Sequence, residues 1–171
     1  MSAEDYMGIF GKSNPKDAFE GMGFEITDTL YDTPPMSMAP TVYQDEKHHK
    51  WAVRIPGQEP RIFDYSDVEG SDVVEDDGTD ALKNASAKGD MFGKFIENPM
   101  LLSKQNAGKR GNTCFSLTVM VQVRGIEDSL LKLPFITRRT DKNTEVYRRI
   151  LKQAETVRDE FRSMAKEANA K

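Results

Sequence analysis

Acidic side chains gather in one segment of the chain and are the first candidates for metal-dependent chemistry. Residues 64–80 hold eight carboxylates and no Lys or Arg. A calcium-binding hand needs oxygen ligands at alternate positions before a glycine and a Glu six residues after it. Around Gly78, Val73 occupies the first of these positions and Asn84 the last, which excludes such a hand. Carboxylates that alternate along a strand usually face solvent, so we expect no bound metal and no cofactor.

The histidines and the cysteine are the remaining candidates for catalysis. His48 and His49 are adjacent, and neighbouring residues on a strand point to opposite faces, so one metal cannot use both. Cys114 is the only cysteine, and as a nucleophile it would need one of these two histidines as its base. Residues 8–13 resemble a phosphate-binding loop, but Tyr6 stands where that loop requires its first glycine. We therefore predict no enzymatic activity.

Basic side chains predict a binding site for an anionic group. Six of them are expected near strand ends and hairpins, namely Lys50, Arg54, Arg61, Lys132, Arg138 and Arg139. Arg and Lys are the side chains that recognise phosphate, so this set is our candidate ligand site. Basic residues on strands also protect sheet edges, and that alternative stays open.

The charges are distributed unevenly along the chain of 171 residues, whose net charge is −4. Residues 1–82 hold 6 basic and 18 acidic side chains, whereas residues 83–171 hold 18 basic and 10 acidic ones. The C-terminal half either presents a basic face to an anionic partner or folds against acidic segments that neutralise it. A pI near 5.3 argues against nucleic acid as the partner.

Hydrophobic alternation predicts antiparallel strands from residue 41 onward. Trp51, Val53 and Ile55 alternate with other residues in the period-2 pattern of a half-buried strand. The turn at residues 56–60 leads to further strands, predicted at 62–65, 68–75, 115–124 and 130–136. On the long strand the residues expected on the buried face are Phe115, Leu117, Val119, Val121 and Val123. We expect strands from both halves to share one sheet. Pro134 should lie on an edge strand or at the end of its strand, because proline cannot donate to a ladder.

A C-terminal helix is predicted over residues 144–168, with Asp141 and Asn143 as candidate caps. Its apolar stripe has spacings of three and four, and consists of Tyr147, Ile150, Ala154, Val157, Phe161, Met164 and Ala168. This stripe either packs against the sheet of the same chain or forms the seam of a weak coiled-coil homodimer.

Two parts of the chain are predicted. Residues 1–40 form an N-terminal extension, partly disordered or loosely packed, in which residues 14–19 favour one helical turn. Residues 41–171 form the folded domain, with a long loop at 79–111 where glycines are scattered among lysines. The longest stretch without a charge has 13 residues, too short for a membrane-spanning helix. With a single cysteine and no secretory signal, we expect a cytoplasmic protein.

Residues 62–68 and 73–78, with sequences IFDYSDV and VVEDDG, carry a resemblance to a known family. The chain is similar over residues 49–166 to an uncharacterised family of small proteins, mostly from Gram-positive bacteria and their phages. That resemblance implies an α+β fold of pleckstrin-homology-like type, a bent antiparallel sheet or partly open barrel capped by the C-terminal helix. It brings no enzymatic activity. Many relatives carry an N-terminal cysteine zinc ribbon, which is missing here because Cys114 stands alone.

These observations predict a non-catalytic interaction module that binds a protein or peptide partner through an open sheet edge or the long loop. The alternative is a peripheral membrane module that recognises anionic lipid headgroups through its basic C-terminal half. A metal-dependent enzyme built on the acidic segment is the third alternative.

Overall fold

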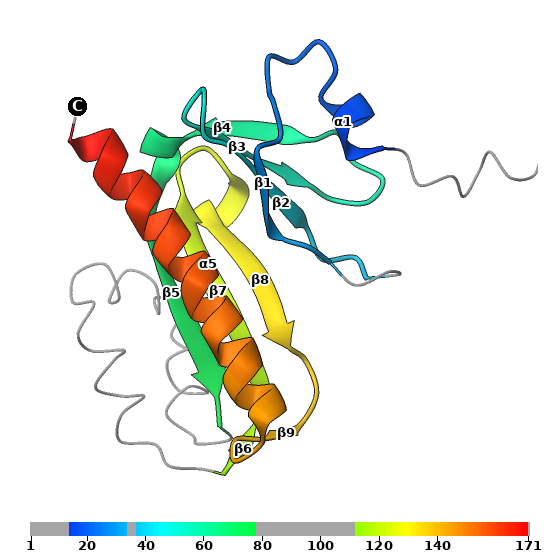
Figure 1. The fold of residues 1–171 in the computed structure, drawn as a ribbon, viewed down its shortest axis with the longest axis vertical. Coiled ribbons are helices and arrows are strands. Elements are labelled where there is room, and N and C mark those ends of the chain that lie inside the picture. Colours follow the sequence, from blue (N-terminus) through cyan, green and yellow to red (C-terminus); the bar gives the residue numbers. More distant parts are fainter. Residues whose placement is uncertain (1–13, 34–36, 78–111, 171) are drawn as a thin grey trace, which may run out of the picture. The chain divides into compact units, whose positions relative to one another are not determined.

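The computed structural model describes residues 14–33, 37–77 and 112–170 and has an α+β fold with antiparallel sheets (Figure 1). The chain divides into two compact units, Met1–Asp64 and Tyr65–Lys171, called unit 1 and unit 2 below. The boundary expected from the sequence was at residue 40, and the expected loop at 79–111 lies outside the described residues. No helix in the described part of the chain is long and apolar enough to cross a membrane.

Unit 1 is a four-stranded antiparallel sheet with strands in chain order, preceded by a single helical turn. Its elements are α1 (Pro15–Ala18), β1 (Asp28–Tyr31), β2 (Thr41–Asp45), β3 (Lys50–Arg54) and β4 (Arg61–Asp64). The predicted turn at residues 14–19 is confirmed, and the Asn14 side chain caps it by accepting a hydrogen bond from the Lys16 amide at 3.2 Å. Strand β1, which lies within the expected N-terminal extension, pairs with β2 and belongs to the sheet.

The core of unit 1 covers both faces of β3. On one face the fully buried Trp51 stacks on Phe63 with ring centroids 4.6 Å apart. On the other face Ala52 is fully buried in a cluster with Phe19 and Phe24. The prediction of a half-buried strand is therefore wrong, because the segment before β1 folds back and supplies aromatic side chains to the second face.

Unit 2 contains a three-stranded antiparallel sheet of order β5-β7-β8, a two-stranded sheet of β6 and β9, and a long helix, α5. The bounds are β5 (Val68–Asp76), β6 (Thr113–Cys114), β7 (Ser116–Val123), β8 (Leu130–Ile136), β9 (Thr140–Asp141) and α5 (Glu145–Asn169). A 3-10 turn at Tyr65–Asp67 comes between β4 and β5, and among the described residues no ladder joins the sheets of the two units. Strand β5 from residues 1–82 shares this sheet with β7 and β8 from residues 83–171, as expected, whereas β1–β4 form a separate sheet. Pro134 lies on the edge strand β8, as predicted.

Helix α5 packs on β5 and β7 and covers one face of the three-stranded sheet (Figure 1). Alternate residues of β7 are fully buried, namely Leu117, Val119, Val121 and Val123. The buried helix residues are Tyr147, Ala154, Val157, Phe161 and Met164, which confirms the predicted stripe. A coiled-coil homodimer would need this stripe to be exposed, but the stripe is buried within unit 2.

Two local expectations for unit 2 are wrong. Phe115 is 40% exposed, because the ladder of β6 with β9 ends at Cys114 and β7 begins only at Ser116. The cap of α5 is Thr144, whose hydroxyl oxygen accepts a hydrogen bond from the Tyr147 amide at 3.2 Å. The candidate caps Asp141 and Asn143 instead bond to each other in the preceding turn.

Replacing Thr144 with Ala is expected to lower the free energy of unfolding of unit 2 by about 1 kcal/mol, because a first-turn amide loses its acceptor. Chemical denaturation followed by circular dichroism at helical wavelengths measures this loss. Thr156→Ala is the matched control, since its hydroxyl only bonds back to the Lys152 carbonyl within the same helix and alanine favours the helix interior. Equal stability of the Thr144→Ala variant and wild type contradicts the capping role.

Candidate functional site

The basic residues expected at a ligand site are divided between the two units. Lys50 and Arg54 lie four positions apart on β3 and share one face of the sheet. Arg61 on β4 pairs with Val53, and residues paired across a ladder share a face. Arg61 therefore lies on the opposite face, with its guanidinium 5.5 Å from the centroid of the Phe63 ring. The three basic residues of unit 1 do not form one cluster.

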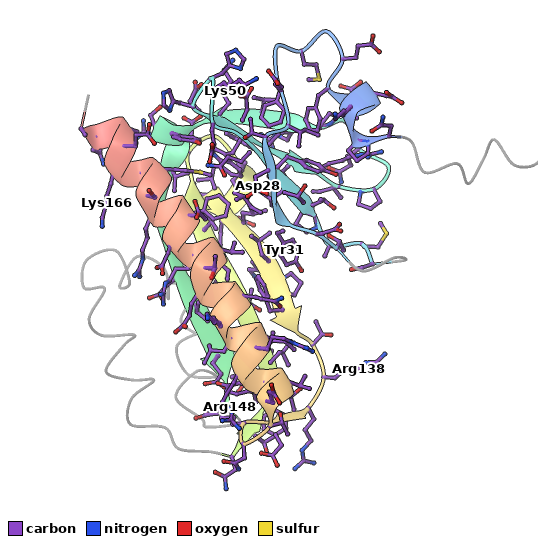
Figure 2. All side chains as sticks on the ribbon, in the orientation of Figure 1. Asp28, Tyr31, Lys50, Arg138, Arg148 and Lys166 are labelled. Atoms are coloured by element: carbon purple, nitrogen blue, oxygen red, sulfur yellow. The ribbon has the colours of Figure 1, made fainter. Side chains whose placement is uncertain are left out.

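The expected residues of unit 2 follow β8 and the segment after it. Lys132, Arg138 and Arg139 are all exposed. Lys132 and Arg138 are six positions apart, roughly 20 Å of extended chain. Arg139 lies 5.6 Å from the centroid of the exposed Phe115 ring. Figure 2 shows Arg138 at the end of unit 2 where α5 begins, the end that also carries Arg148. Ligand binding by these residues stays a prediction.

Folding pairs much of the acidic segment with the basic half. Three carboxylates of β5 form ion pairs with residues from the C-terminal half: Glu69 with Arg124 at 3.4 Å, Asp72 with Arg162 at 3.5 Å, and Glu75 with Lys142 at 3.0 Å. Residues 65–171, which make up unit 2, hold 18 basic and 17 acidic side chains. The unit is therefore close to neutral, which favours the second interpretation of the charge asymmetry.

The edges of the three-stranded sheet carry groups that discourage a further strand. On β5 the Ser71 carbonyl accepts a hydrogen bond from Arg162 Nε at 3.1 Å, and the Val73 amide donates to Asp72 Oδ1 at 2.7 Å. The opposite edge strand, β8, contains Pro134. Side chains that occupy edge groups and prolines that lack an amide are known protections against edge pairing. The edges of this sheet are therefore less suited to pairing with a strand of a partner than the sequence suggested.

Cys114 and its neighbours form a buried polar cluster at the start of α5. Tyr147 Oη donates a hydrogen bond to Glu75 Oε1 at 2.8 Å, and Lys142 Nζ lies 3.0 Å from Glu75 Oε2. Burial, reinforced by the nearby Glu75 carboxylate, raises the pKa of the Cys114 thiol to about 12. The thiol is therefore protonated at neutral pH and is a poor nucleophile. This cluster joins helix to sheet.

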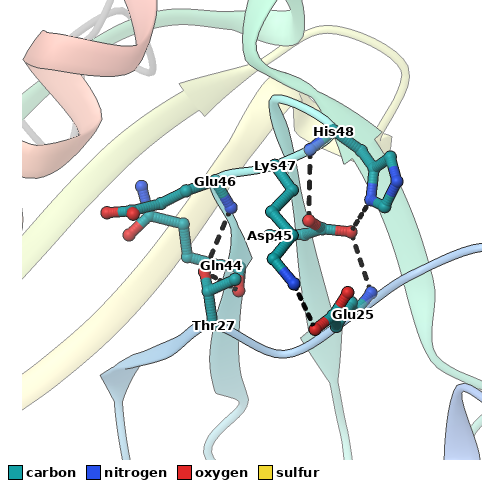
Figure 3. A network of polar contacts seen from close by, with 7 residues as sticks. All are labelled: Glu25, Thr27, Gln44, Asp45, Glu46, Lys47 and His48. Atoms are coloured by element: carbon teal, nitrogen blue, oxygen red, sulfur yellow. Dashed lines mark hydrogen bonds and ion pairs between the residues drawn. The ribbon is translucent and has the colours of Figure 1, made fainter.

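A network of polar contacts in unit 1 centres on Asp45, whose side chain is fully buried (Figure 3). Its Oδ2 accepts hydrogen bonds from the Glu25 amide at 2.8 Å and from His48 Nδ1 at 2.7 Å. Its Oδ1 accepts from the His48 amide at 3.2 Å. Burial raises the pKa of Asp45, but these hydrogen bonds outweigh that effect and hold the pKa below its usual value.

The Asp45 carboxylate also fixes the protonation pattern of the His48 ring. An ionised carboxylate only accepts hydrogen bonds, so Nδ1 carries a proton and the neutral ring keeps its lone pair on Nε2. The His48 side chain is 53% exposed, which leaves the ring accessible to a ligand. From the sequence, we considered His48 only together with His49, as a possible metal ligand or base. The i, i+3 spacing of Asp45 and His48 at a hairpin was the available signal.

Further contacts attach the segment at residues 25–27 to the hairpin between β2 and β3 (Figure 3). Thr27 Oγ1 donates to the Gln44 carbonyl at 3.0 Å and accepts from the Glu46 amide at 3.0 Å. Lys47 Nζ lies 2.7 Å from Glu25 Oε1. These contacts join the segment to the hairpin, and together the two form a support that holds His48 in place.

An open pocket of about 470 Å³ lies beside this support. It is lined by Lys16, Asp17, Phe19, Glu20, Gly21, Gly23, Phe24, Glu25 and His48. Gly21 and Gly23 have φ angles of +76° and +65°, values that favour glycine and let the chain turn sharply around the pocket. No Ser, Thr or Cys is found among the described residues that line it. Among the described residues, no three His, Cys, Asp or Glu side chains are grouped so as to hold a metal ion.

Replacing Asp45 with Asn is expected to destabilise unit 1 by roughly 1–3 kcal/mol, because the amide cannot replace a charged acceptor of three hydrogen bonds. Since the folded pKa of Asp45 lies below the unfolded one, its contribution is complete above about pH 4 and is lost as the pH falls through the folded pKa. The free energy of unfolding should therefore fall more steeply below about pH 4 in wild type than in the variant.

Urea denaturation followed by the fluorescence of Trp51, the only tryptophan, reports on unit 1. Asp28→Asn is the control, because that exposed carboxylate accepts only from the neighbouring Thr29 amide. Equal losses of stability in the two variants contradict the role given to Asp45.

Comparisons of the chain with protein-family models, with curated proteins and with solved structures found no match. The resemblance of residues 62–78 to the bacterial and phage family therefore stays a prediction.

Proposed function

We propose that the chain is a non-catalytic interaction module that binds a protein or peptide partner, and that the pocket beside His48 is its recognition site. The observation that carries this proposal is the fixed imidazole at the pocket. Asp45 is fully buried and holds the ring at 2.7 Å. A polar group that is already immobile loses little entropy when a ligand contacts it, which is how binding sites gain affinity.

The chemistry of the pocket supports binding over catalysis. His48 Nε2 has the lone pair of a general base, but a nucleophile within hydrogen-bond reach is also required for covalent catalysis. The described part of the lining contains no hydroxyl or thiol side chain, and burial keeps the thiol of Cys114 in unit 2 protonated. A pocket of this volume that is open to solvent suits a side chain of a larger partner better than a small molecule, which enzymes usually enclose.

The pleckstrin-homology-like type is part of the same proposal. Antiparallel strands β1–β4 come first, strands β5, β7 and β8 follow, and a single long helix ends the chain. That is the element order which the resemblance implies. The site now proposed differs from the one expected from the sequence, because both edges of the β5-β7-β8 sheet carry groups that oppose an added strand.

Pools of synthetic peptides titrated into the isotope-labelled full chain test the proposal by nuclear magnetic resonance. Amide shifts are expected at residues 16–25 and 45–48. The affinity measured from these shifts should fall about tenfold or more in His48→Asn. This variant keeps a donor for Asp45 but removes the Nε2 lone pair. Arg138→Ala in unit 2 is the control and should behave as wild type. Shifts confined to β8 or to residues 138–139 reject the pocket as the recognition site.

A second candidate function, recognition of anionic lipid headgroups, is favoured by the exposed Arg138 and Arg139 and by the exposed ring of Phe115 beside Arg139. Under this candidate the chain should co-sediment with phosphatidylserine vesicles at low salt and release at moderate salt. Reversing both arginines to Glu should abolish binding. Lys152→Glu combined with Lys166→Glu makes the same charge change on α5 and should preserve most of the binding. The candidate function is rejected if the chain also sediments with zwitterionic vesicles, or if it sediments with neither kind of vesicle.

A further inference from the structure

The His48 ring limits what the pocket can bind. Its Nδ1 proton is committed to the Asp45 carboxylate, so the neutral ring offers only the acceptor Nε2 to a ligand. For the neutral ring, the ligand group that contacts Nε2 is therefore a hydrogen-bond donor. A carboxylate or a phosphate dianion has no proton to offer and does not satisfy this position.

The charges around the ring select the sign of that donor. Among the described residues, the pocket is lined by the carboxylate residues Asp17, Glu20 and Glu25 and by one Lys or Arg, Lys16. Lys47, on the hairpin, pairs with Glu25, while the ionised Asp45 accepts a hydrogen bond from Nδ1 of the ring. Residues 1–64 as a whole hold 11 acidic and 6 basic side chains. The field at the pocket therefore favours a cation and opposes an anion.

The remaining wall of the pocket is aromatic. Phe19 and Phe24 line it with ring centroids 4.7 Å apart. Aromatic rings contact apolar stems and, through their faces, attract cations. A donor tip, a positive charge and an apolar stem occur together in the side chains of Lys and Arg.

We infer that the pocket receives a Lys or Arg side chain of the partner, whose cationic head donates to His48 Nε2 and lies among the carboxylates of Asp17 and Glu20. This inference rests on the proposed function and specifies its ligand. It makes the partner a protein or peptide with an exposed basic residue.

The test titrates four small probes into the isotope-labelled full chain: the N-acetyl amides of arginine, lysine, citrulline and glutamate. Citrulline is the uncharged analogue of arginine and isolates the effect of charge. The arginine and lysine probes should shift the amides of residues 16–25 and 45–48. Citrulline should bind about three- to fivefold more weakly, the range for one partly exposed charged contact. The glutamate probe should cause no shift.

Variants of exposed carboxylates give the second readout. Asp17→Asn and Glu20→Gln should each lower the affinity for the arginine probe about threefold. Asp28→Asn, on β1 and outside the lining, should leave this affinity unchanged. All three positions are exposed, so none of these changes should prevent folding.

The outcomes separate the inference from the proposed function. If citrulline or glutamate binds the same residues as well as arginine does, the cationic specificity is overturned while the pocket remains a binding site. The cationic specificity is also overturned if no probe shifts these residues but the peptide pools do. If neither the probes nor the pools shift them, both proposals fail.

Discussion

Unit 1 depends on one buried carboxylate. Removing an ionised side chain from water costs several kcal/mol unless other donors replace the lost water. For Asp45 these donors are the amide of Glu25 and two groups of His48. The fold can keep this charge buried only while the segment at residue 25 and the hairpin after β2 stay in place. Because both also line the pocket, the interaction that stabilises the unit defines its site.

A second carboxylate plays a similar part in unit 2. Glu75, near the end of β5, receives Tyr147 from α5 and Lys142 from the turn after β9. In each unit an acidic residue at or near a strand end joins segments that are distant in sequence. The acidic segment that first suggested metal chemistry therefore has a structural use. Its cationic partners come from the C-terminal half, which is why it contains none of its own.

Sequence reasoning succeeded where a pattern is local. The alternation over residues 117–123 and the stripe of the C-terminal helix need only neighbouring residues, and both are confirmed. It failed where the deciding partner is remote, as when Phe19 covers Ala52, which a period-2 pattern cannot reveal. The pocket was missed for the same reason. Asp45 and His48 are close in sequence, but the segment opposite them is about 20 residues away.

The connection between β5 and β7 has a kinetic consequence. Asp76 pairs with Ser116, so this ladder closes a loop of about 40 residues, whereas the β2–β3 and β7–β8 hairpins close across short turns. Loop-closure entropy grows with the logarithm of length, and a tenfold longer loop costs roughly 2 kcal/mol more. The hairpins should therefore form early and the β5–β7 ladder late, since remote pairing slows folding. By the same logarithm, an insertion of a given length into this connection should cost less loop-closure entropy than the same insertion into either hairpin turn.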